Sequence, residues 1–156
     1  MGPAEPVEPA EPVEPAEPVE PVEPAEPVEP AEPVVVVTAG QRSEADPTPG
    51  MLREQAIAVE GLWAGLVRTE EHGASGWHHP GDHETAIYVV DGAVRLEFGP
   101  DGGQVVDAGP GDFVHVPKGV VHRESNPTEH ESHLVVVRAG TGPPTVNVDG
   151  PPPRAH

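Results

Sequence analysis

Proline at every third position from Pro3 to Pro33 is the feature that most restricts what this chain can fold into. Glutamate precedes every one of these prolines from Pro6 onward, and the remaining position is alanine or valine. Proline donates no backbone hydrogen bond and keeps the preceding residue out of the helical region, and the like charges repel. We therefore expect residues 1–40 to be a disordered, extended tail that acts as a spacer or, alternatively, as a ligand for a proline-recognising domain.

The charge balance excludes two classes of partner. The chain carries 27 acidic and 8 basic residues, a formal net charge of -19. Nucleic acid and anionic membranes reward lysine and arginine, so we expect neither as a partner. The chain has no cysteine. It also has no apolar run near the ~20 residues of a membrane span and no secretion signal, so we expect a cytoplasmic protein.

Beyond residue 40 the pattern is that of short β-strands separated by turns. Residues 53–69 fit either a loose helical stripe or two strands, and their glycines and β-branched residues favour strands. Val94, Leu96 and Phe98 alternate with polar neighbours, and the preceding Asp91-Gly92 is typical of a hairpin turn. Further short strands are expected at residues 85–90, 104–106, 112–116, 120–122, 133–138 and 146–148.

Turns recur about every ten residues, which predicts an all-β antiparallel sandwich or barrel. We expect one such domain at residues 41–150, followed by a proline-rich tail at residues 151–156. The four valines at residues 34–37 are either an edge strand or an apolar junction.

Histidine is the residue type that points to chemistry. Eight of the nine histidines fall between residues 72 and 133. His78, His79 and His83 cluster beside Glu84, and His115 and His122 flank a Pro-Lys-Gly turn. Imidazole and carboxylate are the ligands that divalent transition metals take when thiolates are absent.

One stretch resembles the second motif of the cupin superfamily. Gly111, Pro117, Gly119, His122 and Asn126 stand at the spacings of that motif. The resemblance implies a double-stranded β-helix, or jelly-roll, barrel with its motif core at residues 72–138. It also implies that His122 is a metal ligand.

The stretch from Trp77 to Gly92 looks like the first cupin motif, with His78 as its first histidine. Pro80 stands where the family has a second histidine, and Thr85 stands where it has glutamate. Side chains alternate between the two faces of a strand. Alternation counted back from the Asp91-Gly92 turn puts Thr85 and His83 on one face and Glu84 on the other. Alternation counted forward from His78 instead puts Glu84 on the same face as His78.

We predict that His78 and His122 bind one divalent transition metal (iron, manganese, nickel or zinc) together with Glu84 or, as its alternative, His83. His79 is less suited, because it neighbours His78 and should point the other way. Asp112 and Asn126 are expected to serve turns and caps, although Asp112 and Glu124 are also candidates for a catalytic base.

The resemblance implies three functions, between which the sequence does not decide. The first is a metal-dependent enzyme acting on a small organic molecule, of the dioxygenase or isomerase kind. The second is a non-catalytic module that binds a small molecule, and the third is a metal-free structural cupin. Because cupins often dimerise, we also expect a homodimer with residues 34–37 or 57–67 near its interface.

Overall fold

The computed structural model describes residues 2, 4, 32–48 and 50–154. The chain divides into two units, Met1–Val35 and Val36–His156. The predicted disorder of residues 1–40 falls mostly outside the described residues and stays a prediction. Residues 34–37, described throughout, form no strand. No helix within the described part of the chain is long and apolar enough to cross a membrane.

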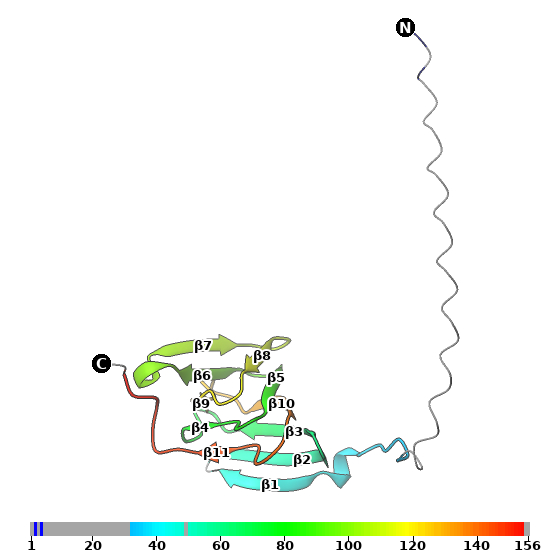
Figure 1. Ribbon diagram of the computed structural model, residues 1–156, viewed down its shortest axis with the longest axis horizontal. Coiled ribbons are helices and arrows are strands. Elements are labelled where there is room, and N and C mark those ends of the chain that lie inside the picture. The colour runs from blue at the N-terminus through cyan, green and yellow to red at the C-terminus, as the bar shows by residue number, and fades with distance from the viewer. Residues whose placement is uncertain (1, 3, 5–31, 49, 155–156) are drawn as a thin grey trace. The chain divides into compact units, whose positions relative to one another are not determined.

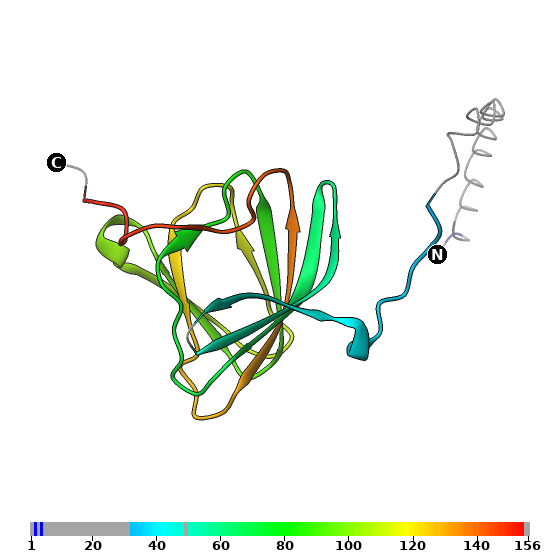
Figure 2. The ribbon, with the colours of Figure 1, turned by 90° about the horizontal axis from the view of Figure 1, so that it is seen from below.

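The second unit is built from two antiparallel sheets that face each other (Figures 1 and 2). The six-stranded sheet has the order β1-β2-β3-β10-β5-β8, and its strands are β1 (Ser43–Thr48), β2 (Met51–Val59), β3 (Leu62–Thr69), β10 (Ser132–Ala139), β5 (Glu84–Asp91) and β8 (Phe113–Val116). The five-stranded sheet has the order β11-β4-β9-β6-β7, and its strands are β11 (Val146–Asn147), β4 (His78–His79), β9 (His122–Ser125), β6 (Val94–Phe98) and β7 (Gln104–Ala108). Two short 3-10 helices, η1 (Ala39–Gln41) and η2 (Pro100–Gly102), complete the described elements. The expected all-β jelly-roll architecture is confirmed.

Alternation along the strands builds the core between the sheets. Buried and less buried residues alternate along β3 and β10, as period-two side chains require. Ile87 and Val89 of β5 have no exposed surface, and Leu134 of β10 is 1% exposed. Because there are few aromatic residues, aliphatic side chains fill most of this space.

Several strand predictions are confirmed and some need correction. Residues 53–69 form strands, β2 and β3, joined at Gly61, whose φ of 84° suits the turn. The Asp91-Gly92 turn does not close a hairpin, because β5 and β6 lie in different sheets. A turn dipeptide reverses the chain locally, but it does not determine with which strand the following strand pairs. The strand expected at residues 120–122 instead begins at His122. Val120 still belongs to the turn, because its backbone N–H donates a hydrogen bond to the Pro117 carbonyl.

Asn126, just after β9, connects the loops at one end of the domain. Its side chain is 1% exposed, and its Nδ2 donates to the carbonyls of Thr69, Glu70 and His130 at 3.1, 3.1 and 2.6 Å. Its Oδ1 accepts from the backbone N–H and the hydroxyl of Thr128 at 3.0 and 2.7 Å. The predicted capping role of Asn126 is thus confirmed, and it holds the end of β9 in place.

Candidate metal centre

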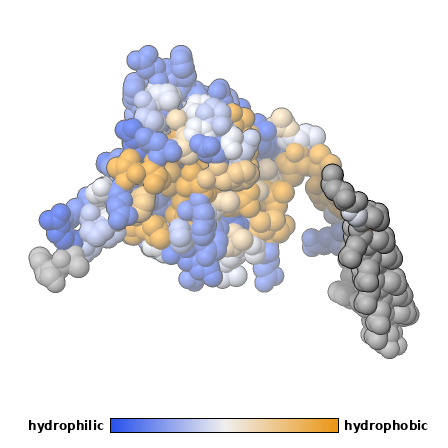
Figure 3. All heavy atoms as spheres, turned by 90° about the horizontal axis from the view of Figure 1, so that it is seen from above, coloured by the Kyte–Doolittle hydropathy of each residue, from blue (hydrophilic) through white to orange (hydrophobic). Residues whose placement is uncertain are grey.

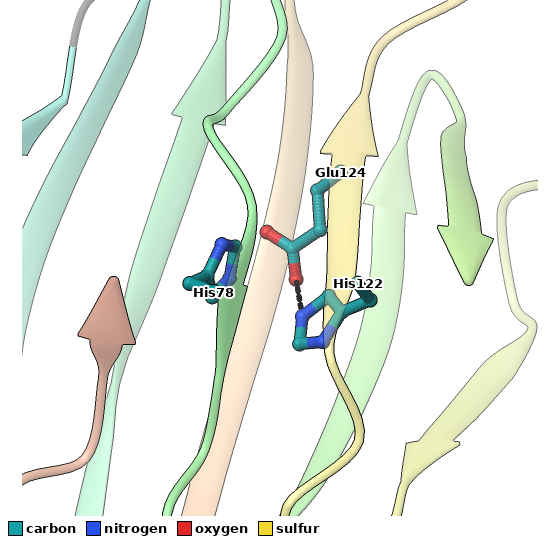
Figure 4. Close-up of side chains that lie close together, drawn as sticks. All are labelled: His78, His122 and Glu124. Carbon is teal, nitrogen blue, oxygen red and sulfur yellow. Dashed lines mark ion pairs between the residues drawn. The ribbon is translucent and has the colours of Figure 1, made fainter. Parts of the chain in front are cut away.

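Two histidines meet across a pair of short strands. His78 of β4 is the direct antiparallel partner of His122 of β9, and their ring centroids are 4.3 Å apart (Figure 4). The side chains are 4% and 3% exposed. The turn at residues 117–120 brings β9 back beside β4, and strand alternation turns both rings into the barrel.

Backbone carbonyls hold both rings in one orientation. His78 Nδ1 lies 2.9 Å from the carbonyl oxygen of Gly76, and His122 Nδ1 lies 2.9 Å from that of Val120. A carbonyl can only accept, so each Nδ1 carries the proton and donates it. The lone pair of each neutral ring is then on Nε2, the arrangement usual for metal-binding histidines.

Glu124 adds a carboxylate from the same strand as His122. Its Oε1 lies 3.5 Å from His122 Nε2, and its side chain is almost fully buried. Burial alone would raise the pKa of Glu124, but the hydrogen bond and charge of His122, with the charges of His78 and Arg53, lower it to about 2. Glu124 is therefore an anion in the interior at neutral pH.

The two histidines respond to their surroundings in opposite directions. Burial lowers the pKa of His78, and the charge of Glu124 only partly offsets this. Burial also opposes protonation of His122, but its contact with Glu124 prevails and raises its pKa. Without a metal, His122 and Glu124 form the principal ion pair of the cluster.

These three residues have the donor set of a metal centre. Within the described ranges, His78, His122 and Glu124 form one group of potential ligands, and their ligand atoms all lie within 4.8 Å of one another. A transition metal lies about 2.0–2.2 Å from each nitrogen or oxygen ligand, so only a small inward movement would be needed. The adjoining cavity has a volume of about 10 Å³, roughly that of one water molecule or ion.

Thr85 and Pro80 line this small cavity. They occupy the two positions where the cupin resemblance expects glutamate and histidine. The Thr85 hydroxyl is buried and has no hydrogen-bond partner. The cavity is thus lined at those positions by residues that offer no imidazole or carboxylate, and the carboxylate present comes from Glu124.

Of the four predicted ligands, the structure brings together His78 and His122. Glu84 lies on the outer face of its sheet, with its side chain 46% exposed and its Oε2 2.8 Å from Nε2 of His115. His83 is buried but lines a different cavity. Side-chain alternation counted back from the Asp91-Gly92 turn therefore holds along β5, with Thr85 inward and Glu84 outward. Alternation counted forward from His78 fails, because Pro80 and Gly81 interrupt the strand.

Glu124 was not among the predicted ligands, although the sequence held a signal for it. Residues two apart on a strand share a face, so an inward His122 implies an inward Glu124. The strand predicted at residues 120–122 ended before Glu124, and this hid the relation.

A larger cavity of about 470 Å³ lies beside the cluster, between the edge strands β7 and β8, and is called the edge cavity here. Its wall is largely aliphatic and includes His122, which thus lines both cavities. Figure 3, seen from the side of β7 and β8, shows apolar surface across the middle of the domain. Val105, Val106 and Phe113 are exposed on these two strands. The volume and lining suit a small, mainly apolar organic molecule.

Comparison with known proteins gives the fold a family. Residues 65–138 match the family model described as a cupin domain. No curated protein matches the chain. Among solved structures, KdgF from Halomonas sp. is similar with a TM-score of 0.59 and 21% identity, covering 69% of this chain and 96% of that one.

Two further solved structures show how widely the fold is used. The polyketide cyclase RemF from Streptomyces resistomycificus has a TM-score of 0.61 and 21% identity, covering 74% of this chain and 85% of that one. The cupin domain of Schizosaccharomyces pombe Cnp3 has a TM-score of 0.58 and 12% identity, covering 71% and 77%. Identities this low show the fold alone. The family-model match, the two sheets and the second motif together identify residues 65–138 as a cupin domain.

Proposed function

We propose that this cupin domain binds one divalent transition metal through His78, His122 and Glu124 and uses it to act on a small organic molecule. The observation that carries the proposal is the pair of buried imidazoles, facing each other across β4 and β9 with both Nδ1 atoms bonded to carbonyls. Two histidines and one carboxylate leave coordination positions open and favour iron(II) among the candidate metals. Bound there, a metal would act as a Lewis acid towards an oxygen atom of the substrate.

The edge cavity is the place we propose for that molecule. Its aliphatic wall would bind an apolar body, and His122 brings the wall next to the metal cluster. An anionic partner is disfavoured, because the ionisable side chains of the wall include the acids Asp107 and Asp112.

A second candidate is a metal-free binding module. It is favoured by Pro80 and Thr85, which replace two ligands of the family pattern. It is also favoured by His122, which is close enough to partner the buried Glu124 carboxylate without a metal. Metal content separates the two candidates.

The test is reconstitution of the full chain with iron(II), manganese(II), nickel(II) or zinc(II) at neutral pH, followed by elemental analysis. We expect about one equivalent of the preferred metal, released as the pH falls through about 6 because imidazole must be neutral to bind. Glu124→Gln should reduce retention strongly, whereas the control Glu84→Gln, at an exposed carboxylate, should not. Retention below about a tenth of an equivalent in the wild type would favour the metal-free module.

We further propose a homodimer that packs through the outer face of the six-stranded sheet. Strand alternation places six exposed large apolar side chains on this face, namely Leu52, Ile57, Val59, Leu62, Val90 and Phe113. A second copy of the chain would cover this exposed apolar surface. A cytoplasmic location is likewise proposed, from the lack of cysteine.

A further inference from the structure

His83 is a buried histidine that the metal cluster does not use. It lies one residue before β5 on the inward face, is 5% exposed, and its backbone N–H donates to the Pro80 carbonyl at 3.0 Å. Its ring Nδ1 is fully enclosed and has no hydrogen-bond partner. Because Nδ1 is enclosed by protein, a molecule in a neighbouring cavity can meet only the other ring nitrogen, Nε2, which is not among the enclosed atoms.

The ring lines a cavity of about 390 Å³ at one end of the barrel, called the hairpin cavity here. Its walls are the tip of the β2–β3 hairpin and the loop after β10, which lie side by side in Figure 2. The Gly140 N–H donates to the Gly61 carbonyl at 3.1 Å and ties the two walls together. The volume lies in the range of small-molecule sites.

The lining indicates what could occupy the hairpin cavity. Ala58, Trp63 and Pro144 offer apolar surface, and few polar side chains besides His83 are present. The acid among them, Glu60, is exposed and disfavours an anion, as does the formal net charge of -19. An imidazole nitrogen can form a hydrogen bond with a hydroxyl group on an otherwise apolar molecule.

We propose that the hairpin cavity binds a small, uncharged, mainly apolar molecule that carries one hydroxyl group, and that the buried His83 ring hydrogen-bonds this hydroxyl. The site is separate from the metal cluster. Pro144 is the residue that the linings of the hairpin cavity and the small metal cavity share. Binding should therefore need no metal, and its failure would leave the proposed metal site untouched.

Phenol and toluene are the matched probes, because they differ by the hydroxyl group. We would titrate each into the ¹⁵N-labelled full chain, free of metal, and follow the backbone amides and the histidine ring nitrogens by NMR. We expect phenol to shift the signals of Gly61, Gly140, Thr141 and the His83 ring. Phenol should also bind about tenfold more tightly than toluene, because the polar atom of the site stays unpaired with toluene.

Variants assign the effect to His83. His83→Leu should lower phenol affinity about tenfold and leave toluene affinity within about twofold, while His83→Gln, which keeps a polar amide, should lose less. His133→Leu, at a histidine of β10 whose side chain is 42% exposed and lines none of the three cavities, is the control and should change neither affinity. If His83→Leu does not fold, His83→Gln and the phenol-to-toluene ratio of the wild type decide.

Three results would overturn the proposal. One is phenol binding without saturation up to about 10 mM, far above the affinities of built sites. Another is a shift pattern centred on Val106, Phe113 and Val116, which line the edge cavity. The third is an equal response of phenol and toluene, or an unchanged phenol affinity in His83→Leu.

Discussion

At the scale of single residues, the pairing of Glu124 with His122 determines how the metal-free protein responds to pH. The carboxyl has its pKa lowered from 4.5 to about 2, and the imidazole has its pKa raised above 6.5. The carboxylate therefore adds stability above pH 4.5 that is lost as the pH falls towards 2. The imidazole adds stability below pH 6.5 that is lost as the pH rises through its folded value.

These signs predict that Glu124→Gln lowers the free energy of unfolding most near pH 5.5. The difference there is on the order of 3 kcal/mol at most, since both pKa shifts report one interaction. It should fall by more than half by pH 3 and also shrink towards pH 8. Urea denaturation of both chelator-treated proteins at the three pH values measures it. An equal difference at all three would mean that the pair is not ionised as described.

Residue-level prediction succeeded where a motif and a strand parity agreed. His122 and His78 could be placed facing inward because turns on either side fix their position. Glu84 and His83 could not, because the sequence alone did not show whether Pro80 and Gly81 interrupt the strand alternation. Only the three-dimensional pairing shows that Thr85 takes the inward place and that Glu84 bonds His115 outside.

At the scale of elements, the order of strands was less predictable than their existence. Strong alternation identified β5, β6 and β10, but nothing local to Asp91-Gly92 indicates that the chain crosses to the other sheet there. β1 was missed because Ser43–Thr48 lacks alternating apolar residues, and its pairing with β2 supplies the order. β4, of two residues, exists through its pairing with β9 and β11.

Asn126 gives a prediction about how the elements are held together. Asn126→Ala should lower the free energy of unfolding by about 3 kcal/mol, because three carbonyls lose their donor and the residue is buried. Asn147→Ala, at an exposed asparagine of β11, is the matched control and should cost less than about 0.5 kcal/mol. Urea denaturation measures both. A loss at residue 126 no larger than at residue 147 would contradict the role described here.

At the scale of the whole molecule, the exposed apolar face of the six-stranded sheet predicts the assembly. Light scattering should give twice the 16.3 kDa mass of the chain at micromolar concentrations. Leu62→Lys, on the outer face, should shift the mass towards the monomer, since a buried lysine would meet apolar surface. Val105→Lys, at a residue that is 52% exposed against 38% for Leu62 and lies on the other sheet, should leave the mass unchanged. A monomeric wild type at about 100 µM, well above the affinity of standard interfaces, would exclude this dimer.

The proposed metal ion sits between His78, His122 and Glu124. The most direct measurement is anomalous diffraction from crystals of the zinc-reconstituted protein, recorded just above the zinc absorption edge. We predict one strong peak per chain, about 2.0–2.2 Å from both Nε2 atoms and from a carboxylate oxygen of Glu124. A peak beside His115 and Glu84 instead, or no peak in the barrel at all, would contradict the account.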